Sequence, residues 1–219
     1  KYQDFASSFK AELFDPAQWA ELIRKSGARY TTLVSKHHDG YCLWPSKYAW
    51  NWNTVDIGPH RDICEELKSA LEKEKIRFGL YYSLYEWDRP LIKESIERYA
   101  LEHMIPQMKE LVNLYQPNIL FTDGEWDYDS SQLHSTEFLQ WLFIKSSVID
   151  TILGSDRWGS DTRSRPGGYF TTAYGAVPLA LVFDPSFHRT RAACRGLFLS
   201  FGSGRSESLA CLFSPRDII

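Results

Sequence analysis

The sequence of 219 residues predicts an α/β fold with a parallel β-sheet, either open or closed into a barrel. Segments with apolar residues at helical spacing alternate along the chain with short segments rich in β-branched and aromatic residues. Each helical segment is long enough to cross between two parallel strands. Polar side chains also gather where the predicted strands end, as they do in parallel α/β enzymes.

The first helix is predicted over residues 15–27 and the first strand over 30–35. Asp15 is a suitable N-cap for this helix, and Pro16 takes its first position, where a missing N–H costs nothing. Gly27 ends the helix, because glycine is the residue that most readily follows a helix C-terminus. The strand that follows, YTTLVS, is rich in β-branched residues.

The second helix is predicted over residues 60–76, where apolar residues recur on one face, and the second strand follows over 77–83. A long helical pattern then covers residues 90–115. We expect this helix to be kinked or broken before Pro106, because proline removes a backbone donor and its ring clashes with the preceding turn.

The third strand is predicted over residues 118–123, the fourth helix over 136–148 and the fourth strand over 151–156. After about residue 172 the alternation stops. All eight Trp lie at or before Trp158, and every Lys lies at or before Lys145. This change in composition indicates two segments of different origin.

The composition, with 43% hydrophobic and 24% charged residues, is that of a globular protein. A net charge of -3 gives no electrostatic argument for nucleic acid or anionic membranes, and we expect neither as a partner. No run of about 18 apolar residues predicts a membrane span. The four Cys form no CxxC pair and no cluster with His, which argues against a zinc site.

The carboxyl ends of parallel strands meet at one edge of a sheet, so side chains that follow the four strands are expected to lie together. These strand-end residues are Lys36, His37, His38 and Asp39; Tyr81, Tyr82, Glu86 and Trp87; Asp123, Glu125 and Trp126; and Asp156, Arg157 and Trp158. Six Trp lie in or beside these loops, where their faces could stack on the apolar surface of a carbohydrate or belong to a large aromatic core. They are Trp44, Trp50, Trp52, Trp87, Trp126 and Trp158.

Asp123 follows an apolar strand and precedes Gly124, which lets a ligand approach the backbone. A carboxylate in this place could be a nucleophile, a base, a metal ligand or a structural acceptor. Glu125 lies two positions on and would share the face of Asp123 if the strand continued. Paired carboxylates about 5–5.5 Å apart are the geometry of retaining glycoside hydrolysis.

The adjacent residues His37 and His38 can bind one small ligand together only if the chain bends after the strand. Neutral imidazoles hydrogen-bond sugar hydroxyls as donor or acceptor. A metal site is the alternative, although neither an HxH nor an HxxxH spacing supports it. Arg157 could clamp an anion or a sugar oxygen, or form an ordinary salt bridge.

The motifs KHHDGYCLWPS, WNWNTVDIGPHRD, FGLYYSLYEW, ILFTDGEWD and DRWG occur in this order within about residues 1–170. Together they resemble the α-L-fucosidases of glycoside hydrolase family 29, in particular the animal lysosomal and secreted enzymes. The resemblance implies a partial (β/α)₈ barrel of about four βα units over residues 1–172, followed by an irregular, divergent tail over 173–219. We hypothesise that a frame shift, an alternative exon or intron read-through produced this tail.

The same resemblance implies a retaining hydrolase that releases terminal α-L-fucose from glycoproteins, glycolipids and oligosaccharides, without metal or cofactor. Asp123 in the DGEW motif would be the nucleophile, and the substrate-binding residues would be His37, His38, Tyr81, Trp126 and Arg157. The resemblance is also compatible with a homo-oligomer. A lysosomal or secreted location is expected, although no signal peptide is visible in this chain.

The sequence also departs from the family pattern. A first strand ending in a His-Trp-Gly motif and a Glu-Trp loop are missing, and no Glu occurs at residues 169–173, where bacterial relatives carry the acid/base. The acid/base therefore stays unassigned, and we expect impaired activity. Two alternatives remain open: a non-catalytic fucose-binding pseudoenzyme, and a metal-dependent hydrolase that uses His37 and His38.

Overall fold

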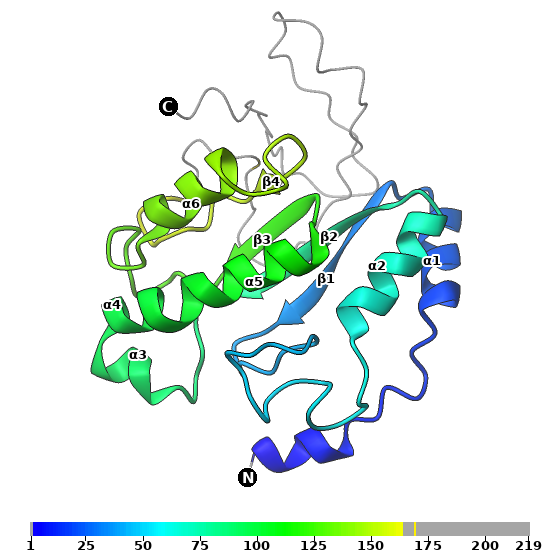
Figure 1. Cartoon of the computed structure of the whole chain (residues 1–219), viewed down its shortest axis with the longest axis horizontal. Helices are drawn as coiled ribbons and strands as arrows, with labels where there is room; N and C mark the ends of the chain where they lie inside the picture. Colours follow the sequence, from blue (N-terminus) through cyan, green and yellow to red (C-terminus); the bar gives the residue numbers. More distant parts are fainter. Residues whose placement is uncertain (1, 164–168, 170–219) are drawn as a thin grey trace, which may run out of the picture.

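A computed structural model of the chain describes residues 2–163 and residue 169 (Figure 1). Its strands form one parallel sheet in the order β1-β2-β3-β4. They are β1 (Tyr30–Lys36), β2 (Arg77–Ser83), β3 (Ile119–Asp123) and β4 (Leu153–Gly154). The helices are η1 (Gln3–Ser8), α1 (Pro16–Lys25), α2 (Ile63–Lys73), α3 (Pro90–Glu94), α4 (Ile96–Tyr99), η2 (Ala100–Met104), α5 (Ile105–Tyr115) and α6 (Ser135–Ile144). The predicted α/β fold with a parallel sheet is confirmed.

The first two long helices begin where an aspartate satisfies their free N–H groups. The Asp15 carboxylate accepts hydrogen bonds from the backbone N–H of Ala17 and Gln18, both at 3.0 Å. Asp62 accepts one from the N–H of Glu65 at 2.9 Å. The second helix therefore begins three residues later than predicted, because Asp62 and not an earlier residue provides the cap.

The long helical segment that ends at Tyr115 is interrupted twice. Ser95 is extended, with φ −162° and ψ 110°, and its hydroxyl accepts from the N–H of Arg98 to begin α4. The π-helical turn η2 then ends immediately before α5, whose second residue is Pro106. The wider turn accommodates a residue that has no N–H to donate. The predicted irregularity before Pro106 is confirmed, whereas the break at Ser95 was not predicted.

The hydrophobic core lies between the sheet and the helices. Leu80, Tyr82 and Leu120 on β2 and β3 are fully buried. Figure 1 shows α5 crossing in front of β2 and β3, with α2 and α1 beside it. The other face of the sheet is more open: Val34 on β1 is 45% exposed, and Tyr81 on β2 is partly exposed. In a barrel, this second face lines the interior.

A β-bulge at Ser35 changes the direction of the side chains at the end of β1. Val34 is opposite Tyr81, but Lys36 is opposite Tyr82, so Ser35 is the extra residue. Its hydroxyl donates to the Tyr81 carbonyl at 2.7 Å. Lys36 therefore lies with Tyr82 on the helix side of the sheet, its Nζ 4.0 Å from the centre of the Tyr82 ring. Lys36, Tyr82 and Glu86 were expected among the strand-end residues of the site, but they lie together on the buried helix side of the sheet instead.

The predicted divergent segment 173–219 lies outside the described residues, so its boundary stays a prediction. In the part of the chain that the structure describes, no helix is long and apolar enough to span a membrane.

Candidate active site

The candidate site lies at the carboxyl ends of β1, β2 and β3, beside the loop that follows β4. Asp123 is the last residue of β3, and the chain turns directly after it at Gly124, whose φ is +86°. A Cβ at Gly124 would lie 2.9 Å from the Cβ of Tyr85, so only glycine lets the loops after β2 and β3 approach this closely. The Leu84 N–H donates to the Asp123 carbonyl at 2.7 Å and joins the two loops.

The Asp123 carboxylate is held by two donors. Arg157 Nη1 donates to Oδ1 at 2.5 Å, and the Tyr81 hydroxyl donates to Oδ2 at 2.9 Å. The Asp123 side chain is 19% exposed and that of Arg157 11%, so the ion pair is largely shielded from water yet open on one side. Charge-assisted hydrogen bonds of this kind fix the plane of a carboxylate.

Tyr81 connects the carboxylate to an aromatic stack. Its ring lies 5.7 Å from that of His37 and 5.5 Å from that of Phe121, nearly parallel to both. Burial and the nearby Asp123 raise the pKa of the Tyr81 phenol far above its usual range. The phenol therefore stays protonated and remains a hydrogen-bond donor to the carboxylate at any physiological pH.

The chain bends after Lys36, so that His37 and His38 lie together. The Gly40 N–H donates to the His37 carbonyl at 3.0 Å, which closes a turn, and the two imidazole centres are 3.9 Å apart. This bend is the condition under which both rings could serve one ligand. His37 is exposed to solvent, whereas the neighbouring His38 is buried.

The hydrogen bonds of Ser83 determine the tautomer of His38. The Ser83 hydroxyl donates its proton to the Tyr85 carbonyl at 2.6 Å, so its oxygen must accept from His38 Nδ1 at 2.7 Å. Burial and the neighbouring His37 lower the pKa of His38, which favours the neutral ring. With its proton on Nδ1, neutral His38 keeps the Nε2 lone pair as an acceptor for a ligand hydroxyl.

Two indoles flank His38. Trp126 lies 4.8 Å from the imidazole in an edge-to-face arrangement, and Trp87 lies 5.7 Å from it. Trp126 is 45% exposed and Trp87 50%. The expectation that loop tryptophans surround the site holds for these two. It is wrong for Trp44 and Trp158, which are buried in the core.

Glu125 does not share the open face of Asp123. Its side chain is fully buried and forms an ion pair with Arg163, Nε to Oε1, at 2.5 Å. The turn at Gly124 ends the strand, so the alternation that would have aligned the two carboxylates does not continue. The chain therefore has no accessible Asp123–Glu125 pair.

The structure brings together all six candidate residues of the sequence analysis: Asp123, His37, His38, Tyr81, Trp126 and Arg157. Sequence reasoning missed Ser83 and Phe121, although Phe121 stands two residues before Asp123 and so shares its face. Within residues 2–163 and 169, no group of three His, Cys, Asp or Glu side chains could hold a metal ion.

A parallel α/β sheet with a shielded carboxylate, paired imidazoles and exposed indoles at its carboxyl edge is typical of barrel enzymes that act on carbohydrates. The comparisons with known proteins agree with this class. A family model described as "Alpha-L-fucosidase" matches residues 1–182. The chain belongs to the α-L-fucosidase family.

Curated relatives give the extent of the similarity. The tissue alpha-L-fucosidase of Rattus norvegicus is 44% identical over 224 residues, covering 100% of this chain and 48% of the rat protein. An alpha-L-fucosidase of Branchiostoma floridae is 46% identical over 178 residues, covering 78% of this chain and 40% of its own length. The chain thus spans less than half the length of these relatives. The rat alignment includes residues 173–219, so that segment has an aligned counterpart in this relative.

Solved structures agree. The Thermotoga maritima alpha-fucosidase in complex with fucose is 34% identical with a TM-score of 0.59, over 73% of this chain and 39% of that one. An alpha-L-fucosidase GH29 from Bacteroides thetaiotaomicron is 25% identical with a TM-score of 0.66, over 73% of this chain and 38% of that one. The described sheet therefore corresponds to part of a family 29 catalytic barrel.

Proposed function

We propose that this protein is a retaining α-L-fucosidase that releases terminal α-L-fucose from glycoproteins, glycolipids and oligosaccharides, with Asp123 as the nucleophile. The observation that carries the proposal is the Asp123 carboxylate held between Arg157 and Tyr81, whose ring in turn stacks on His37. Relatives named tissue and plasma alpha-L-fucosidase support the substrate class and a lysosomal or secreted location.

In this mechanism a carboxylate oxygen of Asp123 attacks the anomeric carbon of fucose. The bond to the leaving-group oxygen breaks while a general acid protonates that oxygen, and water then hydrolyses the fucosyl ester. Arg157 and Tyr81 keep the carboxylate oriented and compensate its charge before attack. The histidines would bind sugar hydroxyls, with His38 Nε2 accepting, and Trp126 would cover an apolar face of the ring.

The general acid is not assigned to a residue. Glu125, the carboxylate nearest to Asp123 in the sequence, is buried against Arg163 and has no path to a leaving group. Because Glu125 is withdrawn from the site, we propose that the chain turns over slowly and favours substrates whose leaving groups need no proton.

The proposal is tested with the purified chain and p-nitrophenyl α-L-fucoside, whose leaving group departs without protonation. Asp123→Ala should abolish release of p-nitrophenol, and Asp127→Ala, an exposed residue on the same loop, should leave it unchanged. Turnover that survives Asp123→Ala would rule out Asp123 as the nucleophile.

A second function, fucose binding without hydrolysis, is favoured by the burial of Glu125 beside an otherwise assembled site. Calorimetry distinguishes the two. A chain that binds fucose, loses binding on His38→Ala and shows no turnover with the activated substrate is a binding protein.

A further inference from the structure

We propose that Glu86 is a positioning residue that holds the loop carrying His37 and His38 in the shape required to bind the sugar. The inference rests on the proposed function, because that function makes fucose the ligand. The effect of Glu86 on the position of His38 can be tested without any ligand. Glu86 does not reach the candidate site. It lies behind it, in the loop that follows β2.

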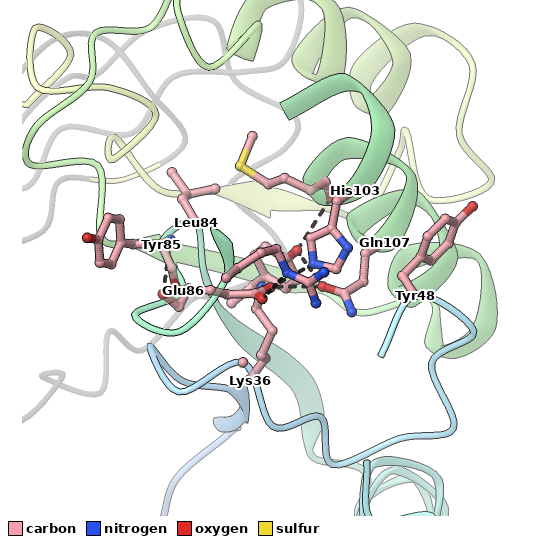
Figure 2. A network of polar contacts seen from close by, with 12 residues as sticks. Lys36, Tyr48, Leu84, Tyr85, Glu86, His103 and Gln107 are labelled. Atoms are coloured by element: carbon pink, nitrogen blue, oxygen red, sulfur yellow. Dashed lines mark hydrogen bonds and ion pairs between the residues drawn. The ribbon is translucent and has the colours of Figure 1, made fainter. Parts of the chain in front are cut away.

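Glu86 is the centre of a buried polar network, which Figure 2 shows between the loop after β2 and helices η2 and α5. Its side chain is only 4% exposed. Lys36 Nζ donates to Oε1 at 2.6 Å, and His103 Nε2 lies 2.8 Å from the same oxygen. Arg89 Nε donates to Oε2 at 2.6 Å. Three basic side chains thus converge on one carboxylate.

This network is attached directly to the candidate site. Lys36 precedes His37 in the chain, and Glu86 precedes Trp87. The Trp87 N–H donates to the His38 carbonyl at 2.8 Å, so the backbones of the two loops are bonded beside the Lys36–Glu86 pair. A shift of the Glu86 carboxylate therefore moves the chain segments that carry both histidines and one of the flanking indoles.

The bulge at Ser35 is what makes the contact with Lys36. In a regular strand Lys36 would share the face of Val34, towards the open side of the sheet. The extra residue sends its side chain to the helix side, where it is fully buried between Glu86, Gln107 and Tyr82. Bulges beside active sites commonly redirect a side chain in this way.

Gly40 adds an independent indication that this loop is shaped around Glu86. Its φ is +75°, and a Cβ built there would lie 2.9 Å from Glu86 Oε2. Gly40 also closes the turn by donating to the His37 carbonyl. The loop can therefore fold over the carboxylate only with glycine at this position.

The charges of the network make its loss costly. Burial alone would raise the pKa of Glu86, but Lys36, His103 and Arg89 outweigh it and hold that pKa well below the usual range. Removing the carboxylate would leave the buried Lys36 ammonium with one remaining acceptor among residues 2–163 and 169, Gln107 Oε1 at 3.3 Å. A buried cation without its partner forces the surrounding chain to rearrange.

The test uses Glu86→Gln in the full chain, with Glu66→Gln as the matched control. Glu66 also pairs with an arginine, Arg61, but it lies in the first turn of α2 and its side chain is 33% exposed. Two quantities are measured: the ring NMR signals of His38 without ligand, and the fucose dissociation constant. A melting temperature is recorded for each variant.

Glu86→Gln should shift the His38 signals and weaken fucose binding about tenfold or more, because a misplacement of about 1 Å has effects of this order. Glu66→Gln can lower the melting temperature, but it should change neither the His38 signals nor the fucose dissociation constant. If folded Glu86→Gln keeps the wild-type His38 signals, the positioning role is refuted.

If wild-type protein does not bind fucose, the proposed function fails, and the ligand-free His38 signals alone decide the positioning role. If Glu86→Gln does not fold, Arg89→Gln replaces it, because the Arg89 side chain is 28% exposed and its loss should be tolerated. Arg89→Gln should shift the His38 signals in the same way, by a smaller amount than expected for Glu86→Gln. Wild-type His38 signals in folded Arg89→Gln would then overturn the inference.

Discussion

The guanidinium of Arg157 and the carboxylate of Asp123 meet at 2.5 Å and join the loop after β4 to the end of β3. The backbone of Arg157 is fixed as well, because the Thr122 hydroxyl donates to its carbonyl at 2.5 Å. Residues next to each other on β3 thus hold both ends of the arginine. This pairing gives Asp123 a fixed orientation and a compensated charge.

Arg157→Lys should lower kcat/KM on p-nitrophenyl α-L-fucoside roughly a hundredfold, because lysine cannot reproduce the planar, directed donors of the guanidinium. Arg98→Lys serves as the control, since Arg98 forms an exposed pair with Glu102 on one turn of helix. Equal activity of the two variants would contradict an orienting role for Arg157.

Tyr81→Phe removes the hydroxyl that donates to Asp123 and keeps the stacked ring between His37 and Phe121. Loss of one hydrogen bond to a charged group is expected to cost about 1.5–3 kcal/mol, or roughly 10- to 100-fold in kcat/KM. Steady-state kinetics measure this, with Tyr128→Phe as a comparison. An unchanged kcat/KM would show that the phenol does not act on the carboxylate.

Ser83→Ala should weaken fucose binding about fivefold, because His38 Nδ1–H loses its acceptor and the ring is free to turn. Calorimetry measures the affinity, and nitrogen NMR of the imidazole reports the tautomer. Ser69→Ala, which removes a hydroxyl on the exposed side of α2, should change neither. A His38 that keeps its Nδ1 proton and its affinity in Ser83→Ala would refute the proposed anchoring.

The free energy of unfolding should fall as the pH drops below 6.5. Burial lowers the pKa values of His38 and His103, so the unfolded chain takes up protons from pH 6.5 downwards while the folded chain does not. Glu86 acts in the same direction below pH 4.5, since its pKa is lowered by folding. Urea titrations at several pH values give the free energy of unfolding as a function of pH. Below pH 6.5 this free energy should change less steeply with pH for His103→Gln than for wild type. Equal pH dependences of the unfolding free energy for His103→Gln and wild type would contradict the account.

The sequence predicted most of the fold because hydrophobic period and cap residues are local. Asp15 and the apolar runs of the first three strands act on their own neighbourhoods, and they appear where they were expected. The fourth strand, predicted over residues 151–156, is limited to Leu153–Gly154. The break at Ser95 could not be predicted in this way. Serine occurs within helices as well as at their ends, so its presence alone does not predict a break. Here Ser95 is extended, and its hydroxyl caps the helix that follows.

The sequence could predict which residues gather at the candidate site, but not how their side chains are arranged there. Strand ends of a parallel sheet converge, so Asp123, Tyr81 and the His pair could be grouped from topology alone. The bulge at Ser35, which withdraws Lys36, depends on a contact with the neighbouring strand. The burial of Glu125 likewise depends on Arg163, which lies 38 positions further along the chain.

The most direct test of the central claim is covalent trapping of the nucleophile. The chain is incubated with a 2-deoxy-2-fluoro-fucosyl fluoride, which slows hydrolysis of the fucosyl ester, and is then digested and analysed by mass spectrometry. The account predicts a fluorofucosyl group on Asp123 and none in Asp123→Ala. A label on another residue, such as Glu125, or turnover of p-nitrophenyl α-L-fucoside without any trapped ester, would contradict it.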